Sequence, residues 1–364
     1  MKTEDENRRA SRGYDRARST DPKEARNDPR RSGSSRAILL HDGVGRNGAG
    51  GEKRTVPNRP PELRRWLKEL PRPVNVAVEA CSFWPAFQEA IGRQVDAIRL
   101  VHPQRVKAIA WAKLKNDRVD SATLAHLLRC DLLPEAWMAD RRTRERRQQV
   151  RLRISLGQHR AALKNQVHAI LHQHGKRTPV SDTFGCKGRA WLRKITLPPV
   201  AREAVDTYSG LIDQVGQHIQ KQDLRLKEMA RGDARAKWLA TIPGVGTYSA
   251  MIILSEIGDI GRFPTAKALF SYAGLVPWVR ESAGHQSRGG ISRCGSPRLR
   301  WVMVEAAHTA LRCSPAARSY FDGLRRRNKH AHVARVALAR KLLAAVFALL
   351  RDGTCFDETI FAAV

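Results

Sequence analysis

Two long stretches with helical spacing of apolar residues lie in the middle of this 364-residue chain. The first covers roughly residues 141–174 and carries many arginines beside its apolar stripe, and the second covers roughly 199–231. A helix with one apolar stripe has to bury that stripe against another surface. We therefore expect a pair of long helices, at residues 141–235, that links two globular parts.

The part before this linker alternates between strand and helix patterns. Strand patterns lie at 74–80 and 97–101, and helical patterns lie at 83–92 and from Asn116 onward. Leu124, Leu127 and Leu128 fall on one face of the last of these helices. The alternation predicts an α/β layer at residues 59–140.

Residues 1–58 lack the apolar content that a folded segment needs. Residues 1–36 are rich in Arg, Ser and Asp, and residues 43–60 are rich in Gly, Arg, Asn and Pro. Only the short stretch from Ala37 to Leu40 is apolar. Such a composition does not offset the entropy cost of ordering, so we expect residues 1–58 to be disordered or aberrant.

The part after the linker has helical patterns with glycine-rich interruptions. We assign a mainly α-helical domain to residues 236–353 and a short tail to 354–364. The last helical pattern, at 333–350, is strongly apolar.

An excess of positive charge runs through the whole chain. Lys and Arg total 66 against 35 Asp and Glu, which gives a formal net charge of +31. A field of that sign favours polyanions and speeds encounter with them. No apolar run approaches the ~20 residues of a membrane-spanning helix, and the sequence begins without the apolar segment of a secretory signal. Composition therefore favours nucleic acid over a membrane as the partner.

The six cysteines are scattered and form no CxxC pair. This spacing argues against a structural zinc site and against a dense disulfide framework. Reduced thiols are typical of the cytoplasm, which is the location we expect.

Three acidic residues form the first candidate site. Glu79 stands at the end of a strand pattern, and Asp117 and Asp120 are three residues apart at a helix start, which places them on one face. Carboxylates grouped in this way are ligands for Mg²⁺ or Mn²⁺, and such metals can align a phosphodiester for in-line attack. The alternative is structural, because Asn116 or Asp117 can cap the helix while Asp120 stabilises its first turn.

The segment 241–250 forms the second candidate site. It contains Ile242-Pro243-Gly244-Val245-Gly246, between the end of one helical pattern and the start of the next. This is the helix-hairpin-helix pattern, in which backbone N–H groups bind a phosphate without reading sequence. The alternative is an ordinary turn between two helices.

The third candidate site is a glycine-rich, cationic loop, at 274–300, that contains Ser282. A serine becomes a nucleophile when a base or metal takes its proton and a cation holds the phosphate charge. Other serines compete for this role, and the loop could equally bind phosphates without reacting. The nearby basic residues are Arg280, His285, Arg288, Arg293, Arg298 and Arg300, and the competing serines are Ser287, Ser292 and Ser296.

Several short motifs occur in an order that is more specific than any one of them. They are Val78-Glu79-Ala80, Lys115–Ser121, Ile242–Gly246, Gly274–Pro277, Glu281–Gly284, Gly289–Ile291 and Gly295–Arg300. Across about residues 60–353, the chain resembles the bacterial insertion-sequence transposases of the one-ten family. Within that family it resembles the eleven-eleven branch, which is related to Piv invertases.

The resemblance implies a fold and a set of site residues. The expected fold is an α/β, RNase H-like (RuvC-like) N-terminal domain with a DEDD acidic set, a coiled-coil linker and a C-terminal transposase domain. By motif position, Glu79, Asp117 and Asp120 match the Glu and the two later Asp of that set, and Ser282 matches the essential serine. The family also implies a homo-oligomer, a dimer or tetramer, that acts on DNA with a structured guide RNA.

The first Asp of the set is where this chain departs from the family pattern. Asp42 follows an apolar stretch but lies close to Glu79, which leaves little room for the usual β-hairpin, and Asp28 has no strand pattern around it. A frameshift or a misassigned start would explain this, and we expect the RuvC-like sheet to lack its first strands.

The sequence as a whole predicts a transposase or site-specific recombinase of a mobile element. In this hypothesis Mg²⁺-bound acids and Ser282 act in cleavage, and Gly244, Gly246 and the loop arginines hold DNA. Two alternatives stay open: a RuvC-like nuclease in which water attacks, and an inactive DNA- or RNA-binding remnant that lacks the first Asp.

Overall fold

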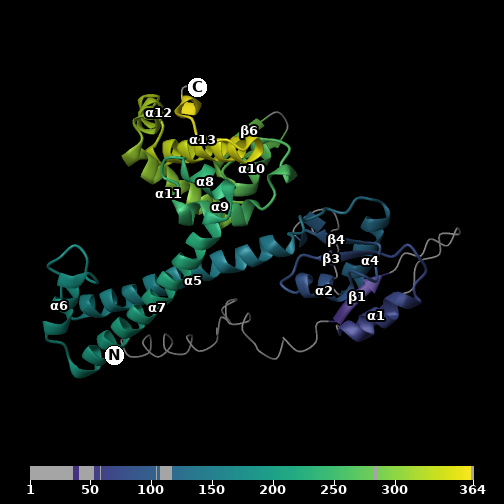
Figure 1. Cartoon of the computed structure of the whole chain (residues 1–364), viewed down its shortest axis with the longest axis horizontal. Coiled ribbons are helices and arrows are strands. Elements are labelled where there is room, and N and C mark those ends of the chain that lie inside the picture. The colour runs from purple at the N-terminus through teal and green to yellow at the C-terminus, as the bar shows by residue number, and fades with distance from the viewer. Residues whose placement is uncertain are drawn as a thin grey trace, which may run out of the picture. The chain divides into compact units, whose positions relative to one another are not determined.

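A computed structural model describes residues 36–40, 53–57, 59–103, 105–106, 117–282 and 285–361 (Figure 1). Side chains are left undescribed at residues 36–40, 53–55, 117–122, 279–288 and 360. The chain divides into two compact units, residues 1–138 and 139–364. Each unit is described by itself.

The first unit contains four described strands. β3 (Asn75–Glu79) and β4 (Ala97–Val101) pair in parallel, and α2 (Trp84–Ile91) makes the crossover between them that a parallel pair requires. The helix α4 (Asp117–Arg129) follows. These elements confirm the strand and helix patterns of residues 74–129.

The other two strands correct the expectation for residues 1–58. β1 (Arg36–Leu40) pairs antiparallel with β2 (Lys53–Pro57), and Ala37 lies opposite Val56. β1 also lies against β3 and α4. The expectation that residues 1–58 form no regular structure is therefore wrong for these ten residues. β1 and β2 form a two-stranded sheet of their own, separate from the β3–β4 sheet, so the expectation that the RuvC-like sheet lacks its first strands stays a prediction. Asp28 and Asp42 lie outside the described residues.

The reason for this difference lies in the partners that these strands find. The buried Val56 packs in one cluster with residues of α1 (Pro60–Glu69), β3 and α2. Segment composition is therefore a poor guide here, because a few apolar residues are stabilised by a core built elsewhere in the chain. The buried members of this cluster are Val56, Leu63, Trp66, Leu67, Val74, Val76, Phe87, Ile91 and Val95.

A second cluster joins α4 to the β3–β4 pair. Leu127 is buried with Val101 of β4, and Leu124 and Ala77 pack at the edge of the same cluster. The apolar face expected for this helix therefore lies against the strands.

The second unit begins with two long helices that pack along each other. α5 (Arg141–Gln173) and α7 (Pro199–Arg231) have the extents that the sequence predicts. α6 (Cys186–Lys194) packs at the end of the pair where α5 ends and α7 begins (Figure 1). At the opposite end of the pair, Val150 of α5 and Leu226 of α7 are buried in the main core of the unit. The helical pair therefore belongs to the same compact unit as the C-terminal helices.

The rest of this unit is a helical assembly around α9 (Thr247–Ile257), in which every residue from Ala250 to Ile257 is buried. A hairpin of strands β5 (Pro277–Ser282) and β6 (His285–Ile291) projects from it. No helix among the described residues is long and apolar enough to cross a membrane. The other helices of this assembly are α8 (Ala234–Ala240), α10 (Ala266–Ala273), α11 (Pro297–Cys313), α12 (Pro315–Arg326) and α13 (Ala331–Asp352), with short 3-10 turns at Ile260–Arg262 and Glu358–Phe361. Of these, α8 and α11 contact α9 directly, as do α5 and α7.

A buried ion pair fixes α5 at the point where α8 begins. Arg146 donates from Nη2 to Asp233 Oδ2 at 3.0 Å, and their side chains are 7% and 9% exposed. Asp233 also accepts two hydrogen bonds from the Arg235 guanidinium, at 2.7 and 2.9 Å. Burial raises the pKa of Asp233, but the hydrogen bond and charge of Arg235 and the charge of Arg146 outweigh it, so the pKa is lowered overall.

This ion pair leads to a first prediction. Asp233→Asn leaves the buried Arg146 without an anion, and we expect the free energy of unfolding to fall by about 3 kcal/mol at neutral pH. Because the folded-state pKa of Asp233 is lowered, its contribution is complete above about pH 4 and is lost as the pH falls further. Urea unfolding of the full chain between pH 3 and 7 therefore shows the two proteins converging in acid.

Asp352→Asn is the matched control, because Asp352 pairs with Arg351 on the surface and surface pairs contribute little. A neutral-pH loss no larger for Asp233→Asn than for this control would contradict the prediction.

Candidate functional site

The acidic residue Glu79 lies at the carboxyl end of β3. It pairs in register with Val101 of β4, and the next residue, Ala80, donates its N–H to the Val101 carbonyl at 2.9 Å. Glu79 is exposed and forms no ion pair with any described residue. Its carboxylate is therefore accessible at a strand end.

The two aspartates occupy the first turn of α4. Leu124 follows Asp117 by seven residues and Asp120 by four, so helical spacing puts all three on one face. Leu124 packs at the edge of the cluster that joins α4 to β3 and β4. Asp117 and Asp120 therefore occupy positions on the side of α4 that faces the strands. Their side chains are not described.

These three residues have the chemistry of a divalent-metal site. Carboxylate oxygens are the hard ligands that Mg²⁺ and Mn²⁺ prefer, and here they come from a strand and from the helix packed on it. Within the described part of the chain, no group of three His, Cys, Asp or Glu side chains forms a metal-binding cluster. The metal site expected at Glu79, Asp117 and Asp120 therefore stays a prediction, because the side chains of the two aspartates are not described.

The segment 241–246 makes the turn between α8 and α9. Gly244 has φ +84°, and a Cβ there would lie 2.2 Å from the carbonyl oxygen of Ala306 on α11. Close packing of the turn on α11 therefore requires this glycine, whether or not a phosphate binds. Gly246 is different, because it is exposed and a Cβ there would meet no atom within 4 Å.

The amino end of α9 is open to an anion. Gly246 is the N-cap residue and provides no side-chain hydrogen bond to the first-turn amides. Arg153 of α5 stacks over the Tyr248 ring at 4.7 Å and also pairs with Asp223. Burial raises the pKa of Tyr248, so this phenol stays neutral at physiological pH. Uncapped amides of this kind can bind a phosphate, whereas the Arg153 guanidinium is already neutralised by Asp223.

Ser282 lies at the tip of a β-hairpin rather than in an irregular loop. It is the last residue of β5 and pairs with His285, the first residue of β6. Pairing the two strands satisfies backbone groups that an open loop would leave to water, which is why the glycine-rich stretch is ordered here.

The strand register sorts the residues of the hairpin onto two faces. Directly paired residues share a face, and residues two apart along a strand share it as well. Arg280, Ser282, His285 and Ser287 therefore lie on one face of the ribbon. Arg288 pairs with Val279 and belongs to the other face. The sequence alone does not show that Arg280 and Arg288 lie on opposite faces.

The base of the hairpin is held by backbone contacts. Gly274 has φ +67° and Gly295 has φ +96°, and a Cβ at Gly295 would lie 2.1 Å from the Tyr272 carbonyl oxygen. Arg300 donates from Nη1 to the carbonyl oxygens of Ala273 and Arg293, at 3.0 and 3.2 Å. Arg300 therefore has a structural function, which weakens its assignment as a DNA contact.

The assignment of Arg293 and Arg298 as DNA contacts stays a prediction. Arg293 is exposed and Arg298 is half-buried, and neither makes an ion pair with a described residue. Both therefore remain candidates for phosphate contact.

The serines that compete with Ser282 differ in their surroundings. Ser296 is 7% exposed, caps α11 through Leu299 N–H and donates to Glu256 at 2.9 Å. The Ser292 hydroxyl is buried and has no hydrogen-bond partner among the described residues. Ser287 shares a face with Ser282, and its side chain is not described. Ser296 is therefore excluded as a nucleophile.

Sequence reasoning missed Glu256, which is 3% exposed on α9. It accepts from Arg151 Nη2 at 3.1 Å and from Ser296 Oγ at 2.9 Å. A single acid in the apolar run Met251–Ile257 was a signal that a buried polar network was present.

Two family models match the chain. The DEDD model of the IS110 elements, described as "Transposase", matches residues 43–175, and the model described as "Transposase IS116/IS110/IS902 family" matches residues 236–322. The first range contains the three acidic residues, and the second contains the α8–α9 turn and the serine hairpin.

Curated proteins match over most of the chain. A probable family 20 transposase of Pseudomonas aeruginosa is 27% identical over 81% of this chain and 89% of its own length. The transposase for insertion sequence element IS1328 of Yersinia enterocolitica is 25% identical over 82% and 89%. A shorter match, 33% identical over 35% of this chain and 40% of the relative, is the pilin gene-inverting protein of Moraxella bovis.

These matches show that the chain is a DNA transposase. The chain belongs to the IS110 family of insertion-sequence transposases. This confirms the family resemblance drawn from the sequence motifs.

The two glycines of the α8–α9 turn give a second prediction. Gly244→Ala places a Cβ against the α11 backbone at a positive φ, and we expect it to lower the free energy of unfolding by about 2 kcal/mol or more. Gly246→Ala meets open space and serves as the matched control, with unfolding close to that of the parent protein. Thermal melts compare them, and equal stability of the two variants would contradict the packing of the turn on α11.

Proposed function

We propose that Ser282 is the nucleophile with which this transposase cleaves and rejoins DNA strands. The Ser282 oxygen forms a bond to the scissile phosphorus while one P–O bond of the strand breaks. The serine proton passes to a base, and the departing oxygen takes up a proton to become a free strand hydroxyl. Attack of a strand hydroxyl on the serine phosphodiester reverses these steps and rejoins DNA.

The pairing of Ser282 with His285 is the observation that carries this proposal. A hydroxyl needs a base within hydrogen-bond reach, and cross-strand neighbours have Cβ atoms ≈ 5 Å apart. His285 is that neighbour, and Arg280 shares the same face of the hairpin. His285 is suited to take the serine proton, and Arg280 is suited to hold the developing phosphate charge.

Glu79, Asp117 and Asp120 are proposed to hold the metal ion of the same reaction. Membership of a DEDD transposase family implies dependence on a divalent metal, and the oxygen-only ligand set favours Mg²⁺ or Mn²⁺. When bound, such an ion neutralises phosphate charge and activates an attacking or leaving oxygen. The position of Glu79 at a strand end beside α4 supports this assignment.

The amino end of α9 is proposed to hold a backbone phosphate in a helix-hairpin-helix manner. Its amides have no side-chain cap, and Gly246 leaves room for close approach. Arg280, Arg288, Arg293 and Arg298 would add charge contacts, with Arg300 contributing mainly to the fold. Assembly as a dimer or tetramer and a structured guide RNA are further proposals from the family.

Replacing Ser282 by Ala gives the third prediction. Ser282→Ala removes the attacking oxygen but no cation, so we expect strand cleavage and covalent protein–DNA adducts to be lost while DNA affinity changes less than threefold. Denaturing gels with end-labelled element DNA measure the adduct, and fluorescence anisotropy measures binding.

Ser292→Ala is its matched control, because it removes a hydroxyl from the same region without touching the hairpin tip. We expect this control to keep forming adducts. Cleavage retained by Ser282→Ala would overturn the nucleophile assignment, and cleavage by the parent protein without any adduct would favour a RuvC-like nuclease that uses water.

Replacing Asp117 by Asn gives the fourth prediction. Asp117→Asn removes one anionic ligand, so we expect cleavage to fall at least 100-fold and partial activity to return at raised Mn²⁺. Asp131→Asn is the control, since Asp131 is exposed and pairs with Arg99 at 2.8 Å. Unchanged cleavage by Asp117→Asn would support the alternative in which this residue only caps α4.

A further inference from the structure

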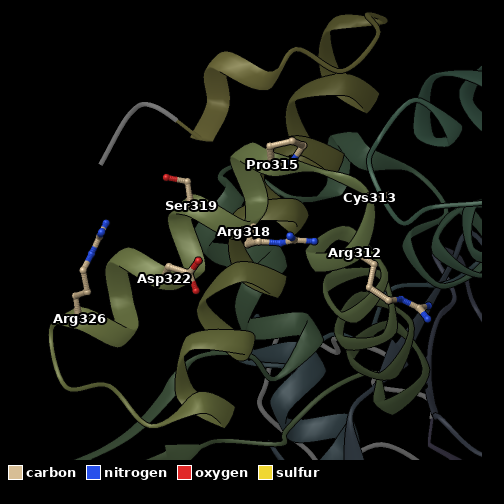
Figure 2. A pocket seen from close by; sticks show the side chains of 7 residues that line it. All are labelled: Arg312, Cys313, Pro315, Arg318, Ser319, Asp322 and Arg326. Carbon is tan, nitrogen blue, oxygen red and sulfur yellow. The ribbon is translucent and has the colours of Figure 1, made fainter.

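An open groove lies where α11 ends and α12 begins, apart in sequence from the serine hairpin. Its volume is about 410 Å³. Figure 2 shows side chains from the α11–α12 junction and from along α12 around it. The residues that line the groove are Arg312, Cys313, Pro315, Arg318, Ser319, Asp322 and Arg326.

The groove carries unpaired positive charge. Arg312 and Arg326 are exposed, and neither forms an ion pair with a carboxylate of the described residues. Arg318 donates from Nε and Nη2 to the Leu311 carbonyl oxygen, at 3.0 and 2.9 Å, which holds it at the groove without neutralising it. Asp322 is the single acidic lining residue. The groove is therefore lined by three positively charged guanidinium groups and one negatively charged carboxylate, which leaves it with a net positive charge.

The basic surface continues past the groove into the turn that leads to α13. Arg325, Arg327 and Lys329 are exposed there. From Gly323 to Arg351 the sequence contains no Asp or Glu at all. The groove is therefore part of a larger cationic surface rather than an isolated pair of arginines.

We propose that this groove binds the phosphodiester backbone of duplex DNA at a position separate from the bond that is cleaved. The proposal rests on the DNA transposase function and adds a second contact surface to it. Exposed guanidinium groups with no carboxylate partner are suited to phosphate oxygens, which they bind through paired N–H donors. The Ser319 hydroxyl supplies a further hydrogen-bond donor.

The lining residues favour a duplex over unpaired bases. Single-stranded binding sites rely on aromatic rings that stack against bases, and none of the residues that line this groove is aromatic. Arg318 and Arg326 are eight residues apart on α12, about 12 Å along the helix axis. The two residues are therefore far enough apart to contact different phosphates of a duplex.

Salt dependence of binding tests this groove. Arg312→Gln with Arg326→Gln removes two charges from exposed positions, so folding is unaffected and thermal melts verify it. With a non-specific DNA duplex as probe, we expect affinity to fall about tenfold. The slope of log affinity against log salt should decrease by about two units, because each phosphate that is no longer neutralised lowers it by about 0.9. The adduct with Ser282 should still form at saturating DNA.

The matched control is Arg225→Gln with Arg231→Gln, which removes the same charge from exposed positions on α7. We expect it to keep a slope close to that of the parent protein. An unchanged slope for the groove variant, or an equal decrease for the control, would overturn the proposal.

A parallel arm with duplex RNA separates the two polynucleotides, and a loss confined to RNA would overturn the assignment to DNA. Failure of the Ser282 mechanism would appear instead as adducts formed by Ser282→Ala, whatever the groove variant does.

Discussion

The packing of α5, α10 and α11 on α9 depends on one buried residue, Glu256 of α9. Its side chain accepts from Arg151 of α5 and from Ser296 at the start of α11. Its carbonyl oxygen accepts from Arg147 at 3.0 Å and from Tyr272 at 3.1 Å. A buried charge without partners would cost several kcal/mol, so these groups hold α5, α10 and α11 against α9 in one arrangement.

The segment that follows the serine hairpin is bound to this network. Ser296 follows β6 by a few residues and is bound to Glu256 while it caps α11. Gly274 and Gly295 allow the backbone to close below the hairpin. The nucleophile proposed at Ser282 would have to be held within a fraction of an ångström of its working position, and a hairpin anchored at its base would provide that better than a free loop. The tip then carries Ser282 beside His285.

Much of the candidate site could be read from the sequence, and the parts that could not depend on pairing. Ser282, Glu79 and the α8–α9 turn could be predicted as site residues because their motifs are local, and their functions stay predictions. Strand register decides that Ser282 lies opposite His285. It also decides that Arg280 shares their face of the hairpin and that Arg288 does not. The structural functions of Arg300 and Ser296 depend on partners 7 to 40 residues away.

The sequence by itself determined the family, the long helices and the cationic character of the chain, because motif order, apolar periodicity and charge are properties of neighbouring residues. The tertiary structure decided that residues 36–40 and 53–57 form strands and that Gly244 is required by packing on α11. It also decided that Ser296 is the serine that donates a hydrogen bond to the buried carboxylate of Glu256. The reason is that burial and backbone pairing arise from contacts between distant segments, which no local pattern records.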